Sequence, residues 1–499
     1  MRTEESDVSD FLLARGDDSD VAIIDGDRRH TYGELRTAAS KIAGSLVEIG
    51  LPPGARVGLL GANSFFWIAA YLAAMKVGVA VPMSDKSTAE DLAGQAEWVD
   101  LAAVLMDRRM VRRFGPAFGD RPTVTDACLQ EDHEPVWPSS ATSPDSDAAL
   151  MFTSGTTSRP RAVRVTHANL LANTRSIVSY LELDRRDRIL VVLPFHYCYG
   201  ASLLHTHLAV GASVALCHTF TFPETAIDQL ERQECTGFAG VPSSFQLLLR
   251  TSSYASRPLP SLRKVQQAGG RLPPPLIREL AAAHPGAKLF VMYGQTEATA
   301  RLSYLPPDLL EDKIGSVGRG IPGVELAVID ESGEPVQPSG VGEIVARGAS
   351  VSPGYVNDPQ ETSRKFPEGM LRTGDLATVD SDGFIFIVGR SGDFIKSWGH
   401  RISSQQIEET VLQHASVGDA AAVGLPDPDA GEAVTLAVMA APNTQIDSAE
   451  LASFLRAHLA KHMVPRSIHV VDSLPLTASG KVSKAELRRL LESLPTQVP

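Results

Sequence analysis

Cysteine is scarce in this sequence, and its placement is not that of a metal site or a disulfide framework. Four cysteines occur in 499 residues, at Cys128, Cys198, Cys217 and Cys235. They lie far apart, form no CxxC pair and have no clustered histidine partner. Reduced and mostly buried thiols are the simplest interpretation.

Long uninterrupted hydrophobic runs are also missing. The N-terminal segment, MRTEESDVSD, is acidic and has no apolar stretch of the kind that a secretory signal needs. The most apolar early stretch, residues 65–83, is interrupted by Lys76, Gly78 and Pro82, which favours a core helix followed by a strand over a membrane span. We therefore expect a cytoplasmic protein without membrane insertion.

Positive charge is in deficit. The chain has 46 Lys and Arg against 59 Asp and Glu, a net charge of −13, which argues against a general nucleic-acid or anionic-membrane surface. The sequence also lacks a Walker-type GxxxxGK segment and a dinucleotide GxGxxG segment between a strand and a helix. Two common classes of nucleotide-binding fold therefore have no support.

Core-forming residues are plentiful, at 43% hydrophobic, and 499 residues exceed one ordinary core. Short β-branched runs alternate with helix-length stretches, a pattern typical of parallel strands joined by helical crossovers. Expected strands lie at 56–60, 79–81, 189–193, 213–217, 237–241, 265–268 and 289–292, and expected helices include 41–49 and 64–75.

The pattern changes twice towards the C-terminus. After Gly315 short strands with turn signals predict an antiparallel β lobe. After residue 394 we expect a compact α+β unit with strands at 420–425, 433–440 and 468–471 and helices at 448–462 and 483–491. The predicted fold class is α/β, with an N-terminal domain (1–391) of two doubly wound αβ lobes plus a β lobe, and a small mobile C-terminal domain (392–499) that begins at a hinge, Gly392.

One loop combines hydroxyl groups with a conformationally free residue. Directly after an apolar strand end come Thr153, Ser154, Gly155, Thr156 and Thr157. Hydroxyls and backbone N–H groups in such a loop form an anion-binding nest, and Arg159 and Arg161 add positive charge for a polyphosphate. Taken alone, the segment is equally compatible with a plain turn.

This segment resembles the phosphate loop of the adenylate-forming superfamily, which includes acyl-CoA synthetases, aryl-CoA ligases, adenylation domains and firefly luciferase. The superfamily pattern TSGTTGxPKGV stands here as TSGTTSRPRAV. Ser158 and Ala162 replace two glycines and Arg161 replaces the lysine. Arginine still supplies cationic donors, although its planar fork is not equivalent to an ammonium group.

Further motifs in the superfamily's order carry the resemblance from about Thr31 to Lys484. They are AGGRL (268–272), YGQTE (293–297), RTGDL (372–376) and the Gly389-Arg390 pair. The resemblance implies that Thr296 contacts phosphate, Glu297 holds Mg²⁺ and Asp375 accepts both ribose hydroxyls. It also implies further ATP or AMP contacts at Gly269, Gly270, Arg271, Tyr293, Gly294, Gln295, Ile387 and Arg390.

Two C-terminal motifs complete the match. DFIKSWGHRISSQQIEE (393–409) places Gly399 where the superfamily passes the pantetheine thiol arm. LPLTASGKVSK (474–484) places Lys481 at the position of the catalytic lysine.

The segment LPFHYCYG (193–200) departs from the superfamily. Where many CoA ligases have histidine and amino-acid adenylation domains have aspartate, this chain has Tyr197, preceded by His196. The missing carboxylate disfavours recognition of an α-amino acid, and the resemblance places Val241 in the same acyl pocket. His205 and His207 lie two apart on a helix and so do not share a metal.

The resemblance implies ATP- and Mg²⁺-dependent adenylation of a carboxylic acid with pyrophosphate release, catalysed by Lys481, Glu297 and Thr296. Transfer to a thiol would follow, on CoA or on a separate phosphopantetheinyl carrier protein, since no carrier segment follows Lys481. Two alternatives remain: activation of another oxyanion such as nitrite, and a degenerate nucleotide-binding protein without turnover. The oligomeric state stays open.

Overall fold

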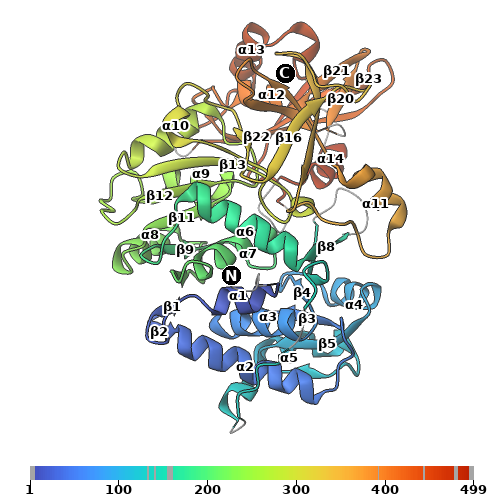
Figure 1. The fold of residues 1–499 in the computed structure, drawn as a ribbon. Coiled ribbons are helices and arrows are strands. Elements are labelled where there is room, and N and C mark those ends of the chain that lie inside the picture. The colour runs from blue at the N-terminus through green and yellow to red at the C-terminus, as the bar shows by residue number, and fades with distance from the viewer. Residues whose placement is uncertain are drawn as a thin grey trace. The chain divides into compact units, whose positions relative to one another are not determined.

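The structure is a computed structural model that describes residues 6–131, 134–139, 142–153, 161–390, 393–441, 444–476 and 482–493 (Figure 1). The chain divides into two compact units. The first consists of Met1–Ile314, Gly318–Leu326 and Ala346–Arg372, and the second of Gly315–Val317, Ala327–Val345 and Thr373–Pro499. Ser154, Gly155, Thr156, Thr157, Gly392 and Lys481 lie outside the described residues, so their predicted roles stay predictions.

The first unit contains a nine-stranded sheet whose central strands are parallel and whose edge strands are antiparallel. Its order is β15 (Arg319–Gly320), β14 (Ser303–Leu305), β13 (Lys288–Tyr293), β12 (Lys264–Gln267), β11 (Gly237–Gly240), β9 (Arg188–Val191), β10 (Ser213–Leu216), β1 (Val21–Asp25) and β2 (Arg28–Thr31).

A second sheet of the same unit has six strands, parallel except for its last pair. Its order is β6 (Thr123–Val124), β5 (Leu101–Met106), β3 (Arg56–Leu60), β4 (Val79–Met83), β7 (Asp147–Phe152) and β8 (Ala162–Thr166). Helices connect the strands of both sheets: α2 (Tyr32–Glu48), α3 (Phe65–Val77), α4 (Ala89–Trp98), α5 (Arg108–Phe114), α6 (His167–Leu181), α7 (Cys198–Leu208), α8 (Pro223–Arg232), α9 (Pro242–Thr251) and α10 (Pro274–Ala283). Two further helices of this unit are α1 (Val8–Leu13), which precedes the first strand, and α11 (Pro359–Lys365), which follows the last strand of both sheets in the chain.

Local sequence explains where these helices begin. The Thr31 side chain accepts a hydrogen bond from the backbone N–H of Glu34, and the Glu34 carboxylate accepts one from the backbone N–H of Thr31, so α2 starts nine residues before the predicted helix at 41. Ser64 caps α3, which begins at Phe65, one residue after the predicted start of that helix. The first helix, α1, contacts α3, α6 and α7 and so joins the helical layers of the two sheets (Figure 1).

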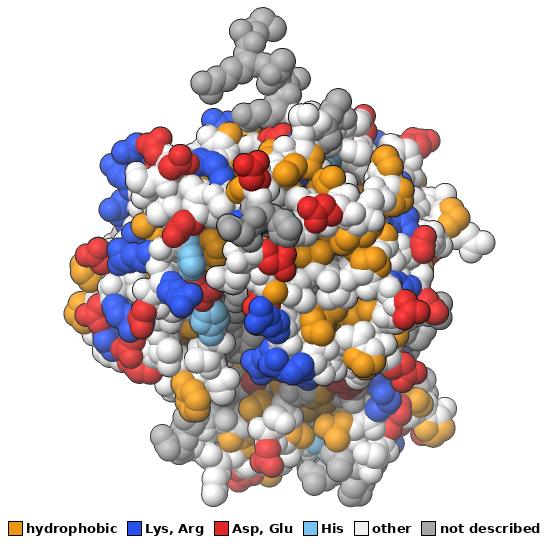
Figure 2. Space-filling model, turned by 90° about the horizontal axis from the view of Figure 1, so that it is seen from below, with side chains coloured by type: hydrophobic (Ala, Val, Ile, Leu, Met, Phe, Trp, Pro, Cys, Tyr) orange, Lys and Arg blue, Asp and Glu red, His pale blue; other side chains and the backbone are white. Residues whose placement is uncertain are grey.

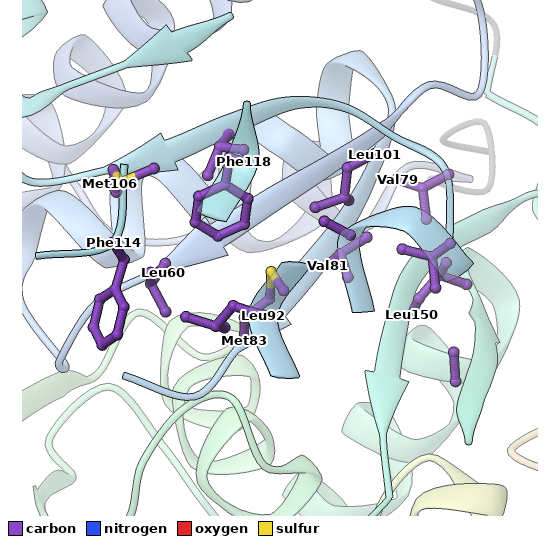
Figure 3. Packing of buried hydrophobic residues seen from close by; sticks show 14 of the residues in the cluster. Leu60, Val79, Val81, Met83, Leu92, Leu101, Met106, Phe114, Phe118 and Leu150 are labelled. Atoms are coloured by element: carbon purple, nitrogen blue, oxygen red, sulfur yellow. The ribbon is translucent and has the colours of Figure 1, made fainter. Parts of the chain in front are cut away.

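An apolar core is formed by side chains of the six-stranded sheet and of the helices that pack on it. Leu60, Met83, Phe114, Phe118 and Leu150 pack together from three strands, α5 and the 3₁₀ helix that follows α5, and all are at most 5% exposed (Figure 3). Full burial of such a side chain contributes about 1.5–3 kcal/mol.

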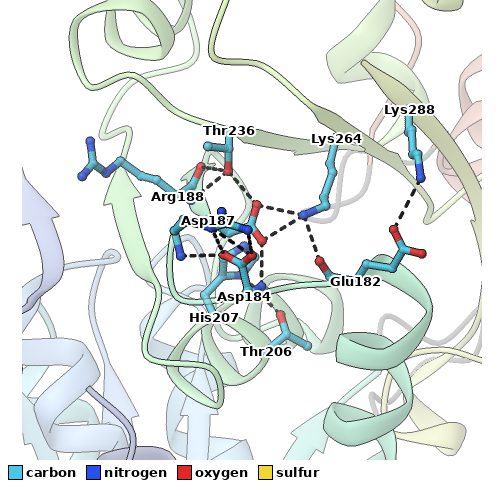
Figure 4. Close-up of polar contacts among 10 residues, drawn as sticks. Glu182, Asp184, Asp187, Arg188, Thr206, His207, Thr236, Lys264 and Lys288 are labelled. Atoms are coloured by element: carbon cyan, nitrogen blue, oxygen red, sulfur yellow. Dashed lines mark hydrogen bonds and ion pairs between the residues drawn. The ribbon is translucent and has the colours of Figure 1, made fainter. Parts of the chain in front are cut away.

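A polar cluster fixes the other sheet at the start of its strands. Asp187, directly before β9, is 4% exposed in its side chain and receives hydrogen bonds from Lys264 Nζ at 2.9 Å and Thr236 Oγ1 at 2.9 Å (Figure 4). Lys264 begins β12, and Thr236 directly precedes β11. Three neighbouring strands are therefore held at their amino ends, which leaves their carboxyl ends for function.

The second unit contains an α+β domain. A sheet in the order β21 (His400–Ser403), β20 (Phe394–Ser397), β23 (Gly431–Ala440), β22 (Val417–Asp427), with β24 (Ser467–Val470) on β23, carries α12 (Ser404–Val411), α13 (Ser448–His458) and α14 (Lys484–Glu492). A further sheet has the order β16 (Val324–Ile329), β17 (Val341–Gly348), β18 (Leu371–Val379) and β19 (Ile385–Arg390).

The predicted α/β fold class is confirmed, but several predicted element ends differ from the structure. The helix predicted over 448–462 ends at His458, because the extended backbone of Leu459 brings that side chain and Met463 into the domain core. Within the described residues no helix is both long and apolar enough to cross a bilayer. On the face shown in Figure 2, basic and acidic side chains are interspersed.

Candidate active site

Four segments that the sequence marks as functional follow four neighbouring strands of the nine-stranded sheet. They come after β9 (193–200), β11 (Val241), β12 (269–271) and β13 (294–297), and these strands lie in the order β13-β12-β11-β9. The carboxyl ends of parallel strands meet at one edge, where ligands bind in open α/β sheets. The structure therefore brings these predicted residues to one edge of the first unit.

The glycines of this edge are explained by close packing of protein. A Cβ on Gly294 would lie 1.9 Å from the carbonyl oxygen of Ala300, and one on Gly269, at φ +84°, would lie 2.8 Å from Val241 Cγ1. No other residue fits either position. Gly270 accepts a hydrogen bond from Gln267 through its carbonyl oxygen at 2.7 Å. Arg271 follows it, with its Nε buried.

Glu297 lies in a short 3₁₀ helix, Thr296–Ala298, and its carboxylate is held by a phenol. The Tyr355 hydroxyl donates to Glu297 Oε1 at 2.8 Å. Burial raises the pKa of Tyr355, and the negative charge of Glu297 raises it further. The phenol thus stays protonated and orients the carboxylate. Tyr355 was not predicted, because nothing in the local sequence links it to a residue 58 positions away.

This arrangement fits a magnesium ion held mainly by a nucleotide. Mg²⁺ is usually bound by one or two carboxylates together with substrate phosphates and waters, rather than by an all-protein cage. Glu297 supplies one oriented carboxylate. Across the described part of the chain, no three His, Cys, Asp or Glu side chains gather into a metal-binding group.

A strained turn follows Glu297. Thr299 has φ 67° and ψ −58°, and Ala300 N donates to the carbonyl oxygen of Ala298 at 2.7 Å, which is the rare γ-turn geometry. The Thr299 hydroxyl donates to the Ser350 carbonyl at 2.7 Å. Strain of this kind persists only where the surroundings enforce it, and it concentrates at functional sites.

Thr296 and its neighbours connect two of the loops. The Thr296 hydroxyl lies 3.4 Å from Cys198 Sγ, so the YGQTE segment touches the first residue of α7. Tyr293 ends β13 with 9% exposure, and Gln295 carries a buried Nε2 with no hydrogen-bond partner among the described residues.

The two residues that flank the predicted phosphate loop, Thr153 and Arg161, are joined by a backbone hydrogen bond, and the Arg161 side chain forms ion pairs. Thr153 N donates to the Arg161 carbonyl at 2.9 Å. The Arg161 guanidinium pairs with Asp358 at 3.4 Å and with Glu361 at 3.7 Å, both in the first turn of α11 or at its cap. As a phosphate ligand, Arg161 would have to share its donors with these carboxylates, so its role stays a prediction.

The two predicted pocket side chains after β9 are neutral at pH 7. Burial lowers the pKa of His196 to about 4, with a smaller effect from the charge of Lys86. Burial raises the pKa of Tyr197 to about 12, and the charge of Asp85 adds to it. Their rings lie 4.3 Å apart, and His196 Nε2 is buried without a partner in the described chain. The pair can therefore offer a neutral hydrogen-bonding edge.

His205 and His207 bond to different groups. His205 Nε2 lies 3.2 Å from the Tyr71 hydroxyl, whereas His207 Nδ1 lies 2.8 Å from the Leu203 carbonyl. Both side chains are core residues of α7.

In the second unit, the predicted ribose contacts are adjacent. Asp375 and Arg390 lie directly opposite each other on β18 and β19, and Arg390 Nε donates to Asp375 Oδ1 at 2.8 Å. Asp375 is 4% exposed. Ile387 lies on the same strand as Arg390. A carboxylate held in this way retains lone pairs for further donors.

Gly399, the glycine predicted to meet the thiol arm, occupies a tight turn. Trp398 (φ 52°) and Gly399 (φ 74°) form the two-residue connection between β20 and β21, which requires positive φ at both positions. A Cβ on Gly399 would meet nothing within 4 Å, so backbone conformation rather than crowding favours glycine here. Trp398 is 63% exposed.

The segment that carries Lys481 is anchored on both sides. Leu476 and Val482 form an isolated antiparallel bridge, and Ser483 N donates to the Pro475 carbonyl at 2.8 Å. Lys484 Nζ pairs with Glu408 Oε1 at 3.1 Å and ties the start of α14 to α12.

In the first unit, the strand-end loops and the fixed carboxylate of Glu297 lie at the carboxyl edge of an open α/β sheet, the edge at which such folds bind ligands. Comparison with known proteins gives the family. A family model described as "AMP-binding enzyme" matches residues 13–356, and one described as "AMP-binding enzyme C-terminal domain" matches residues 406–481. The chain belongs to this family of adenylate-forming proteins and is an AMP-forming ligase.

Curated relatives span nearly the whole chain. The chain is 30% identical over 480 residues to an oxalate–CoA ligase of Arabidopsis thaliana, covering 91% of this chain and 92% of that protein. It is 31% identical over 484 residues to a feruloyl-CoA synthase of an Amycolatopsis species, covering 94% and 95%.

Solved structures of CoA synthetases are similar to this chain over nearly its whole length. The o-succinylbenzoate CoA synthetase of Bacillus subtilis, in complex with its acyl-adenylate intermediate, superposes with a TM-score of 0.88 at 27% identity, covering 98% of this chain and 99% of that one. The same enzyme with ATP and a magnesium ion gives a TM-score of 0.87 at 27% identity, with 97% and 99% coverage.

Proposed function

We propose that the protein is an acid–CoA ligase that works in two steps. A carboxylate oxygen attacks the α-phosphorus of ATP, forming acyl-AMP and releasing pyrophosphate. The CoA thiol then attacks the acyl carbon, forming the thioester and releasing AMP. The observation that carries this proposal is the Glu297 carboxylate, fixed by Tyr355 at the carboxyl edge of the sheet, in a chain similar throughout its length to CoA ligases.

In the first step the protein acts by positioning and by charge stabilisation, since no protein nucleophile is needed. Thr153 and the hydroxyls of residues 154–157 would cradle the phosphates, and Thr296 would meet the α-phosphate. A magnesium ion on Glu297 would neutralise charge on the departing pyrophosphate. Asp375, oriented by Arg390, would hold the ribose hydroxyls.

Lys481 would complete the first step by bridging the attacking carboxylate oxygen and the phosphoryl group. For the second step, we propose that the chain turns at Gly392, withdrawing Lys481 and presenting the Gly399 turn to the thiol arm. Glycine suits a hinge because it tolerates large dihedral changes.

The two relatives described above, the oxalate–CoA ligase and the feruloyl-CoA synthase, are named for CoA thioesters. Their names support free CoA as the acceptor. A separate carrier protein remains a predicted alternative acceptor. Those names span acids as different as oxalate and ferulate, so they leave the acid of this enzyme open. They give no support to nitrite activation or to nucleotide binding without turnover.

A coupled assay tests the proposal. We expect pyrophosphate release from ATP, Mg²⁺ and at least one member of a panel of aliphatic and aryl acids, together with a CoA thioester of the mass of that acid. Nitrite with an aryl amine is the comparison substrate. Release with nitrite alone, or ATP binding without turnover of any acid, would contradict the proposal.

A further inference from the structure

One buried cation in the first unit is not needed for the chemistry proposed above. Arg301 follows the γ-turn after Glu297 and is only 2% exposed. Its guanidinium carbon lies 4.1 Å from the ring centroid of Tyr199. Two of its donors, Nε and Nη2, have no hydrogen-bond partner in the described chain.

The charge of Arg301 has no counter-charge in the described chain: its guanidinium contacts are aromatic and neutral. Burial raises the pKa of Tyr180 to about 12, and the charge of Arg301 and a hydrogen bond to it lower that pKa in part, so the neighbouring phenol is neutral at pH 7. Asn173, which donates to the Arg301 carbonyl at 3.0 Å, is also neutral. Buried charges in proteins are ordinarily paired, and stacking on Tyr199 offsets only part of the desolvation cost.

The position of Arg301 links it to the predicted acyl pocket. A Cβ on Gly294 would lie 2.7 Å from Arg301 Cα, and one on Gly269 would lie 3.9 Å from Tyr199 Cδ1 and 2.8 Å from Val241 Cγ1. The cation and its stacking partner thus adjoin the residues that the sequence assigns to the nucleotide and acyl pockets.

A second observation concerns Gln266 on β12. Its Oε1 and Nε2 are both buried without a partner in the described chain, and its carbonyl accepts a hydrogen bond from the Tyr199 hydroxyl at 2.7 Å. Two residues that adjoin one tyrosine therefore leave polar atoms unpaired. Native proteins rarely leave such groups unpaired except where a ligand or water completes them.

A small cavity lies among residues that neighbour Tyr199 and Arg301 in the chain, although neither of these two residues lines it. The cavity is lined by Cys198, directly before Tyr199, and by Ala300, directly before Arg301. Its lining also includes Asn173, Ser202 and Thr299, which are neutral and polar.

We propose that Arg301 is a specificity residue, and that the acid activated by this enzyme carries a second carboxylate that pairs with its guanidinium. This inference rests on the proposed activation of a carboxylic acid. The reacting carboxylate would face the α-phosphate, and the second would supply the missing counter-charge. Arginine suits this task because its fork binds a carboxylate through two parallel hydrogen bonds.

Paired substrates test the inference. Short aliphatic and aryl dicarboxylic acids are each compared with their own monomethyl ester by pyrophosphate release, in the wild type and in Arg301→Met, Arg301→Lys and Arg278→Met. In the wild type we expect the best diacid to exceed its monoester in kcat/KM by about 10- to 100-fold, the range for a charge-assisted hydrogen bond.

The variants separate recognition from structure. Arg301→Met should remove the preference for the diacid, leave turnover of the monoester within a few fold, and raise Tm, because a buried unpaired charge has been deleted. Arg301→Lys should keep part of the preference. Arg278, an exposed residue paired with Glu311, should behave as wild type when replaced by methionine.

Two results would overturn the inference while leaving the proposed function intact. One is equal wild-type activity on diacids and their monoesters. The other is an Arg301→Met variant with a lower Tm and an equal loss of kcat/KM on the diacid and on its monoester, which would mean that the arginine has a structural role. If no acid releases pyrophosphate although the wild type is folded and binds ATP, the proposed function fails and this inference fails with it.

Discussion

The Glu297 carboxylate is held by the neutral phenol of Tyr355, and a neutral partner leaves the negative charge of Glu297 in place. A cationic partner would neutralise the carboxylate, whereas Tyr355 donates one hydrogen bond and leaves the negative charge in place. At the residue scale, the site is therefore organised around the orientation of one carboxylate.

Removal of that phenolic hydroxyl tests its role. Tyr355→Phe should lower kcat about 10-fold and raise the Mg²⁺ concentration needed for half-maximal rate, because a hydrogen bond to a charged group contributes about 1.5–3 kcal/mol. Tyr254→Phe is the matched control, since the Tyr254 hydroxyl is buried with no partner in the described chain. Equal Mg²⁺ dependence in wild type and Tyr355→Phe would remove the phenol from the site.

Arg161 has two possible tasks, and its variants distinguish them. If it is a phosphate ligand, Arg161→Ala should raise the ATP KM and slow adenylation, while Arg161→Lys should keep much of the activity. If it serves only Asp358 and Glu361, Arg161→Ala should leave the ATP KM unchanged and lower stability by about 0–1 kcal/mol, as for a partly exposed pair. Steady-state kinetics together with thermal unfolding decides between them.

At the element scale, α7 contains two buried neutral histidines and follows a third. Burial lowers the pKa values of His196, His205 and His207 to about 4 from 6.5. The unfolded chain therefore binds more protons than the folded chain between these values. Stability is fully present above pH 6.5 and is lost as the pH falls through this window.

We expect Tm to fall steeply between pH 6.5 and about 4, the window set by these shifts. Replacing one buried group, as in His205→Phe, should make the slope of Tm against pH shallower, whatever it does to Tm itself. His458→Gln, at an exposed position, is the control variant. A slope that is identical in all three proteins would show that the α7 histidines do not control acid unfolding.

The pairing of β18 with β19 makes a further prediction. Asp375→Ala should weaken ATP binding about 10- to 100-fold, because ribose hydrogen bonds to a charged group, worth about 1.5–3 kcal/mol each, are lost. Isothermal titration calorimetry on a variant of normal circular dichroism measures this directly. Unchanged affinity would exclude Asp375 from the nucleotide site.

Strands and motifs were predictable where the information is local. The β-branched runs at 213–217 and 237–241 gave β10 and β11 within one residue, and the motif positions after β9, β12 and β13 followed. Long-range contacts were not predictable. Tyr355, the Thr299 turn and the unpaired Arg301 depend on segments far apart in the chain or on backbone strain, for which a single sequence carries no periodic signal.

At the scale of the whole molecule, the proposal assigns Lys481 to one of two half-reactions. Lys481→Ala should abolish acyl-AMP formation while largely sparing thioester formation from supplied acyl-AMP, because the lysine would serve only the first step. Single-turnover assays of each half-reaction measure this. An equal loss of rate in acyl-AMP formation and in thioester formation would contradict the assignment of Lys481 to the first step alone, and with it the proposed turn at Gly392.

The most direct test of the central claim follows one oxygen atom. When the acid is labelled with ¹⁸O in its carboxylate, attack on the α-phosphorus puts a labelled oxygen between the acyl carbon and phosphorus, and thiol attack then leaves it on AMP. Mass spectrometry should find one ¹⁸O in AMP and none in pyrophosphate. Unlabelled AMP, or label in a released phosphate, would contradict adenylation of the acid.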